Sequence, residues 1–197
     1  MSAAQQVPSA QSVIEAALVS TRADLNAVDE NGETLLLRAA TLKDKKTALE
    51  LCTRLVGSGA SPSARCRHER TVLIEIVRMR NFNWDIALLL RSSINDKGDG
   101  GKTALMWAVS GHGAMAQRRG NLGLVSHLLQ LGASLSVQDK NGFTALGHAI
   151  KANDTNTNTE MIEYLRSEMV REQAMKTFGE NYLSAFDDYG RLNIRER

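Results

Sequence analysis

The stretch NGFTALGHAI, residues 141–150, decides the fold, because its residue types describe a tight turn followed at once by a helix. Gly142 supplies the positive φ that a tight turn needs. Thr144 stands just before an apolar run, where a helix N-cap accepts a hydrogen bond from an otherwise unpaired backbone N–H. The stretch therefore predicts a turn, a cap and a helix in immediate succession.

The same pattern occurs three more times, as NGETLLLRAA at residues 31–40, ERTVLIEIV at 69–77 and GKTALMWAV at 101–109. Each copy carries Thr, any residue and then Leu. The threonines are spaced by 37, 32 and 41 residues, which indicates a repeat with insertions. These threonines are Thr34, Thr71, Thr103 and Thr144.

A second helix is predicted after each of the first three copies, from apolar residues at helical spacing. The apolar stripes are Leu49, Cys52, Leu55 and Val56; Ile86, Leu89 and Leu90; and Leu124, Val125, Leu128 and Leu129. A unit of two helices cannot bury such a stripe by itself, so neighbouring units must stack to form one continuous core.

On these residues the chain resembles the ankyrin-repeat family, whose unit begins D-x-x-G-x-T-P-L-H-x-A-A and ends near G-A-x-x-N. The matching positions are Asp29, Gly32, Thr34, Leu36, Ala39 and Ala40, and Asp139, Gly142, Thr144, Leu146 and Ala149. The second copy matches least, with Cys66 and Glu69 where Asp and Gly would stand. The resemblance implies an all-α solenoid of about four stacked helix-turn-helix units with N- and C-terminal capping helices.

One domain is expected after a disordered N-terminal tail at residues 1–11. The expected segments of that domain are an N-cap half-repeat at 12–27, repeat 1 at 28–63, a degenerate repeat 2 at 64–95, repeat 3 at 96–136 with an insertion at 111–120, repeat 4 at 137–172 and a C-terminal cap at 173–197.

Composition favours an ordinary soluble protein of the cytoplasm, with the nucleus also open. The chain is 43% hydrophobic and 23% charged, as is ordinary for soluble globular proteins. Its formal net charge of +2 is too small to indicate by itself a protein that binds nucleic acid or a membrane surface. We see no secretory leader and no apolar run long enough to span a bilayer. The two cysteines form neither a CxxC pair nor a metal-ligand series, which suits a reducing compartment.

No motif predicts catalysis. DKGDGGKT, residues 96–103, ends like a phosphate-binding loop, but Asp96 stands where that loop needs its first glycine. No nucleophile elbow surrounds Ser110, and the four histidines lack the spacing of metal ligands. We therefore expect a protein that is not an enzyme, with no catalytic residue, metal, cofactor or small-molecule substrate.

The resemblance places the partner-binding surface on the concave face, formed by the turn tips and the exposed edges of the first helices. There the sequence predicts a basic groove studded with aromatics that binds an acidic peptide or protein, with Trp107 and Phe143 as anchors. Alternatives are solvated lysines on turn tips and a nucleic-acid-binding accessory protein that uses the same basic strip. The predicted partner-binding residues are Arg67, His68, Arg70, Arg78, Lys102, Trp107, Lys140, Phe143, His148 and Lys151.

Overall fold

The computed structural model describes residues 9–20, 23–79, 82–110, 121–152 and 158–178, and these residues are helical with connecting turns. Their only extended pairings are two isolated bridges, Val28 with Thr34 and Arg65 with Thr71. The α-helices are α1 (Ala10–Val19), α2 (Leu35–Ala40), α3 (Lys45–Gly57), α4 (Val72–Arg78), α5 (Trp84–Leu89), α6 (Ala104–Ser110), α7 (Leu122–Gln130), α8 (Ala145–Lys151) and α9 (Thr159–Phe178). Two 3-10 turns, η1 (Arg91–Ser93) and η2 (Asp99–Gly101), lie between α5 and α6.

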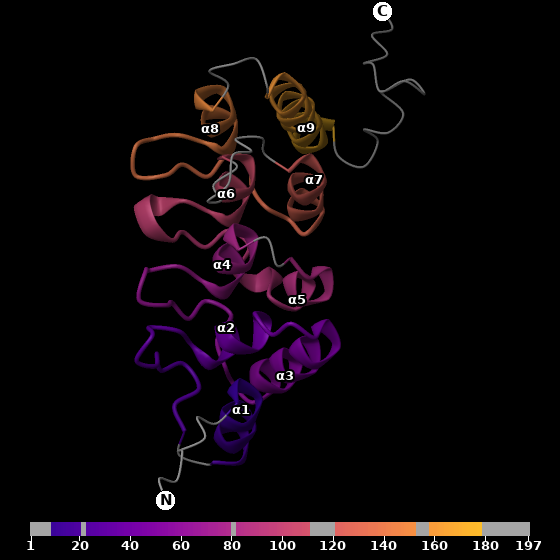
Figure 1. The fold of residues 1–197 in the computed structure, drawn as a ribbon. Coiled ribbons are helices and arrows are strands. Elements are labelled where there is room, and N and C mark those ends of the chain that lie inside the picture. The colour runs from indigo at the N-terminus through magenta and orange to yellow at the C-terminus, as the bar shows by residue number, and fades with distance from the viewer. Residues whose placement is uncertain (1–8, 21–22, 80–81, 111–120, 153–157, 179–197) are drawn as a thin grey trace, which may run out of the picture.

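The helices form two stacked layers (Figure 1). One layer holds α2, α4, α6 and α8, each packed against the next, and the other holds α3, α5, α7 and α9. Helix α1 packs on α2 and α3 at one end of the stack, and α9 packs on α8 at the other. This arrangement confirms the predicted helical repeat stack.

Four turns project from the layer of first helices, on the side of the stack away from α3, α5, α7 and α9 (Figure 1). We name them turn 1 (residues 29–34), turn 2 (66–71), turn 3 (98–103) and turn 4 (139–144). In each turn the first residue donates its backbone N–H to the carbonyl oxygen of the fifth, at 2.8 to 3.0 Å. The four turns therefore share one backbone path although their side chains differ.

The predicted threonine caps are confirmed in all four turns. Thr34, Thr71 and Thr144 are the N-caps of α2, α4 and α8, and each hydroxyl accepts the backbone N–H three residues later. Thr103 does the same for Met106, with 3.4 Å between Oγ1 and the nitrogen. Because each cap ends a turn and begins a helix, it fixes the direction in which the turn leaves the stack.

One continuous hydrophobic core runs the length of the stack. The leucine two positions after the threonine is buried in the first three units, as Leu36, Leu73 and Leu105, and is partly buried as Leu146 in the fourth. Second helices contribute Leu55, Ile86 and Leu128, and the C-cap of α5 contributes Leu90, while Ile14 of α1 covers the N-terminal end of the core. Each fully buried side chain of this size contributes about 1.5–3 kcal/mol.

Two expected boundaries differ from the helices. Helix α1 begins at Ala10 with Ser9 as its N-cap, so it starts inside the predicted tail. Helix α9 runs without interruption from Thr159 to Phe178, across the expected border between residues 172 and 173. The expected insertion at 111–120 and the end of the predicted C-terminal cap, residues 179–197, lie outside the described residues.

No helix of the described part is long and apolar enough to cross a membrane.

Candidate interaction surface

Turn 4 is organised by a buried carboxylate. Oδ1 of Asp139 accepts the backbone N–H groups of Asn141 and Phe143 at 2.8 and 2.9 Å, and its Oδ2 lies 2.9 Å from Nε2 of His148. Burial by itself would raise the pKa of the Asp139 carboxyl, but the hydrogen bonds from Phe143, Asn141 and His148 together hold that pKa below its usual value. The carboxylate therefore fixes both the turn and the imidazole of α8.

Turn 1 uses the same device, with Arg38 in the place of His148. Oδ1 of Asp29 accepts the backbone N–H groups of Asn31 and Glu33 at 2.8 and 3.0 Å, and Oδ2 pairs with Nη1 of Arg38 at 3.1 Å. Arg38 and His148 both stand four residues after the threonine of their unit. The basic side chain at this position therefore contacts the turn and not the surface.

Turn 2 contains the reversed charge pair. Glu75 stands four residues after Thr71, with only 5% of the residue exposed, and Oε1 of Glu75 accepts from Nε of Arg70 at 2.5 Å. The thiol of Cys66 lies 3.8 Å from the same oxygen. The other oxygen, Oε2, lies 3.5 Å from Nε of Arg78. The buried carboxylate thus comes from the helix, and a cation comes from the turn.

These contacts correct the expectation for two of the predicted surface residues. Arg70 and His148 were expected on the exposed face, but each is only 8% exposed. A buried polar or charged group needs a partner, and a carboxylate orients both side chains inward: Glu75 for Arg70 and Asp139 for His148. The sequence pattern could not show this, because both partners lie several residues away along the chain.

Trp107 lies beside two cations that come from different elements. Nζ of Lys102, in turn 3, is 4.9 Å from the centroid of the indole ring, and Cζ of Arg78, at the end of α4, is 5.8 Å from it. All three side chains are partly exposed. Cations at such distances interact favourably with the face of an aromatic ring. We call this set the tryptophan station.

A second, smaller aromatic group lies on turn 4 and α8. Phe143 is 37% exposed, and Nζ of Lys151 is 5.1 Å from its ring centroid. Gly147 makes room for the ring, because a Cβ at this position would lie 3.2 Å from Cδ1 of Phe143. We call Phe143 and Lys151 the phenylalanine station.

The remaining predicted residues lie on the exposed tips of the turns. The backbone N–H of Arg67 donates to Gly32 and its guanidinium to the carbonyl of Glu30, which ties turn 2 to turn 1. Lys140 ties turn 4 to turn 3 through a backbone hydrogen bond to Gly100 of 3.0 Å. The side chains of Arg67, His68 and Lys140 are exposed. We call the surface of exposed and partly exposed predicted residues the turn face; it comprises Arg67, His68, Arg78, Lys102, Trp107, Lys140, Phe143 and Lys151.

Three aromatic rings on the other layer did not stand out in the sequence. The ring of Trp84, in α5, stacks on His127 of α7 at 3.7 Å between centroids and meets Phe82 edge-on at 4.5 Å. Trp84 is 44% exposed. A tryptophan at the start of a short second helix was the available signal, but the stacking depends on the distance between α5 and α7, which the sequence does not give.

The chemistry of the described residues offers little to a metal or an enclosed ligand. Within them, no group of three His, Cys, Asp or Glu side chains could hold a metal ion. Two hollows of about 290 and 360 Å³ lie along α9, but the carboxylates that line them, Glu168 and Glu172, are paired with Arg171 and Lys176. Burial raises the pKa of the Cys52 thiol to about 12, so this sulfur is a packing group and not a nucleophile.

The stacked helical pairs with projecting turns define a helical repeat protein. A sequence model of the ankyrin repeats matches residues 112–166, which include α7, α8 and the first part of α9. Over these residues the chain is similar to the ankyrin repeats, which supports its resemblance to that family. Proteins of this family are in general interaction modules that bind other proteins and do not catalyse reactions. No curated protein matches the chain in sequence.

Proposed function

We propose that this protein is a non-catalytic interaction module whose turn face binds an acidic segment of a partner protein. The observation that carries the proposal is the clustering of cations around two aromatic rings, the partly exposed Trp107 and the exposed Phe143. Two of these cations flank Trp107 and one flanks Phe143. Aromatic rings and arginine are the side chains that most often dominate interface energies, and both are present here.

The charge is placed unevenly along the turn face, and this favours one end for the acidic segment. Turns 3 and 4 with α8 present Lys102, Lys140 and Lys151, whereas turn 1 presents Glu30 and Glu33. An acidic segment is therefore attracted to the half of the face nearer α8 and repelled by turn 1. We expect its contacts to centre on the tryptophan and phenylalanine stations.

The shape of the surface also favours a macromolecular partner. The residues of the two stations belong to projecting turns and to the layer of first helices (Figure 1), whereas small-molecule sites are usually concave and enclose most of their ligand.

The two cysteines bear on where the partner is met. Both cysteines are free thiols in the described structure, as is usual for proteins of a reducing compartment. We propose on this ground that the protein binds its partner in the cytoplasm.

A charge-reversal experiment tests the proposal. Peptides that bind the full chain are first selected from a random display library. Their affinity is then measured for the triple variant Lys102→Glu, Lys140→Glu and Lys151→Glu. We expect enrichment of Asp and Glu in the selected peptides and a loss of affinity of at least about tenfold in the variant, because three favourable charge contacts become repulsive.

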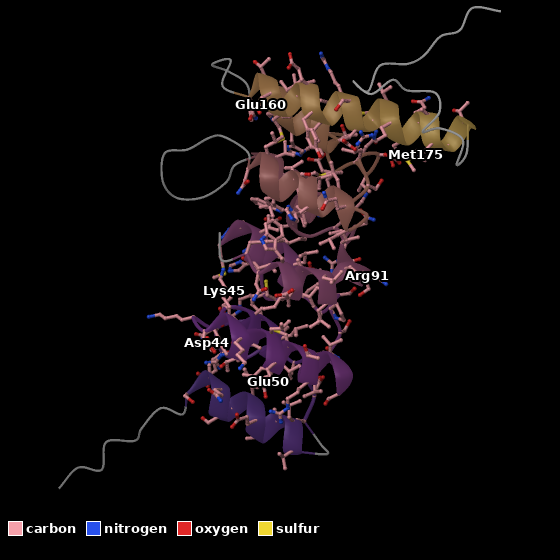
Figure 2. All side chains as sticks on the ribbon, turned by 90° about the vertical axis from the view of Figure 1, so that its right-hand side faces the viewer. Asp44, Lys45, Glu50, Arg91, Glu160 and Met175 are labelled. Carbon is pink, nitrogen blue, oxygen red and sulfur yellow. The ribbon has the colours of Figure 1, made fainter. Side chains whose placement is uncertain are left out.

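A matched control changes three cations of the other layer: Lys45→Glu, Lys46→Glu and Arg91→Glu. Figure 2 looks onto this layer and labels Lys45 at the start of α3 and Arg91 after α5; all three residues are exposed. Both triple variants change the net charge equally, so a non-specific charge effect would weaken binding in both. Equal loss of affinity in the two variants, or no loss in either, contradicts the proposal.

The nucleic-acid alternative is separated by salt. Binding that rests on phosphate contacts falls steeply and linearly with the logarithm of salt concentration. A single-stranded oligonucleotide of mixed sequence serves as the probe. Three results together would replace the protein partner by a nucleic acid. The probe would bind more tightly than the selected peptides, its binding would be lost in the turn-face triple variant, and the salt dependence of its affinity would correspond to several phosphate contacts.

A further inference from the structure

We infer that Arg78, Lys102 and Trp107 form a binding site for two neighbouring carboxylates of an acidic peptide, with Glu75 as the residue that positions Arg78. The inference deepens the proposed function and rests on it. It names the chemical group that the tryptophan station recognises and the spacing of that group within the partner.

The three side chains are brought together by elements distant in the sequence. Arg78 ends α4, Lys102 belongs to turn 3 and Trp107 lies within α6. Because both cationic groups lie within 6 Å of one ring centroid, they are separated by no more than about 11 Å. Two anionic groups a few ångströms apart can therefore reach both cations at once.

The charge balance at the station leaves both cations available. Glu75 is the carboxylate that pairs with Arg78, but its nearer partner is Arg70, at 2.5 Å against 3.5 Å. Among the described residues, Nε of Arg78 has no hydrogen-bond acceptor and Lys102 takes part in no ion pair. One buried carboxylate thus faces two cations, Arg70 and Arg78, and Lys102 adds a third positive charge at the partly exposed ring of Trp107. Two carboxylates from a ligand would neutralise it.

Because Glu75 contacts Arg78 through Nε, it positions the guanidinium group and leaves the two terminal nitrogens available to a ligand. Oε2 of Glu75 approaches Nε from the buried side, while 36% of the Arg78 side chain is exposed. The two terminal nitrogens of a guanidinium group form the fork that binds a carboxylate through two parallel hydrogen bonds. The ring of Trp107 restricts the rotation of that fork, so less conformational freedom is lost when a ligand binds.

The spacing of the cations selects the spacing of the ligand. In an extended peptide, side chains at positions i and i+2 lie on the same side, about 7 Å apart. A Glu-x-Glu segment therefore places one carboxylate at Arg78 and the other at Lys102. Two glutamates six positions apart in an extended chain lie about 20 Å apart and cannot reach both cations.

The test uses Trp107 as its own reporter. The chain contains two tryptophans, and Trp84→Phe leaves Trp107 as the only one while keeping an aromatic ring against His127. In this background, two capped peptides of identical composition are titrated: Gly-Ser-Glu-Ala-Glu-Ser-Gly, with neighbouring glutamates, and Glu-Gly-Ser-Ala-Ser-Gly-Glu, with separated ones. We expect the first to change the Trp107 emission and to bind at least about fivefold more tightly.

Substitutions then assign the roles of the cations. Arg78→Gln and Lys102→Gln should each weaken binding of the first peptide about tenfold, and Arg78→Lys about threefold because the charge stays and the fork is lost. Lys45→Gln, in the other layer, is the control and should change nothing. Circular dichroism and urea unfolding confirm that each variant is folded. Equal binding of the two peptides, or no response of Trp107 emission up to millimolar peptide, overturns the inference.

Failure of this inference is distinguishable from failure of the proposed function. If library-selected peptides lose affinity in the turn-face triple variant but Trp107 emission does not distinguish the two glutamate peptides, the turn face binds partners and the dicarboxylate site is wrong. If the selected peptides are insensitive to the triple variant, both proposals fail.

Discussion

Turn 2 and turn 4 follow the same backbone path with the positions of their charges exchanged. In both, the first residue donates its N–H to the carbonyl of the fifth, at 2.9 Å from Cys66 and 3.0 Å from Asp139. The fourth residue has a positive φ in both, 57° for Glu69 and 79° for Gly142. Yet the buried carboxylate is Asp139 within turn 4 and Glu75, on the helix after turn 2.

The comparison shows which features the repeat retains. The backbone bond and the threonine cap are present in both units, whereas the aspartate that begins turn 4 and the glycine Gly142 are replaced in turn 2 by Cys66 and Glu69. A buried carboxylate paired with a basic side chain is also retained, although the two members have exchanged places between turn and helix. The exchange has a consequence for the surface, because Glu75 also reaches Arg78 and so supports the tryptophan station.

The largest expected effect is at the centre of the exchanged pair. Glu75→Gln leaves the buried guanidinium of Arg70 without a counter-charge, and we expect a loss of about 3–5 kcal/mol in the free energy of unfolding, measured by urea titration. The double variant Arg70→Met with Glu75→Leu removes both charges and should lie within about 1–2 kcal/mol of the wild type. A loss below about 1 kcal/mol in Glu75→Gln would mean that the pair is not essential to turn 2.

The sequence predicted the repeats and the caps but not the charge pairs. Thr34, Thr71, Thr103 and Thr144 cap their helices as expected, because a cap depends on residues three positions apart. Arg70 and His148 were assigned to the surface because repeat positions do not reveal whether a side chain turns inward toward a residue five or nine positions away. The contacts of Trp107 with Lys102 and Arg78 join three elements, and the sequence pattern does not give the distances between those elements.

A second prediction compares two glycines with equivalent φ. Gly32 in turn 1 has φ +75° and Gly142 in turn 4 has φ +79°, so alanine is strained at both. A Cβ at Gly32 would also overlap the Cβ of Arg67, whereas one at Gly142 meets no atom within 4 Å. We expect Gly142→Ala to cost about 1 kcal/mol and Gly32→Ala about 3 kcal/mol in urea unfolding. Equal costs would show that the contact between turns 1 and 2 is loose.

A third prediction concerns acid. The pKa of Asp139 is lowered in the folded protein, so its contribution to stability is present above its unfolded-state pKa of about 3.9 and is lost as pH falls through the folded-state pKa. Asp139→Asn should cost about 2 kcal/mol at pH 6, where a charge-assisted acceptor is removed. The difference from the wild type should shrink as the pH falls from 5 to 3. A difference that is constant over this range contradicts the assigned role.

The smallest effect is expected at Glu69, where a residue with a side chain occupies the glycine position of the turn with φ 57°. Glu69→Gly relieves the strain of the left-handed backbone conformation. It also raises the conformational entropy of the unfolded chain and removes an exposed ion pair with Arg65, at 3.9 Å, and both of these effects lower stability. We expect a net gain of about 0.5–1 kcal/mol in the free energy of unfolding. A loss of stability would mean that the Glu69 side chain makes a contribution larger than its strain.

The most direct test of the turn face as the binding surface is hydrogen–deuterium exchange of the full chain with and without a library-selected acidic peptide. We predict slower exchange in turns 3 and 4 and in α6 and α8, with exchange in α3 and α5 unchanged. Protection confined to α3, α5 and α7, with turns 3 and 4 exchanging as in the free protein, would contradict the account.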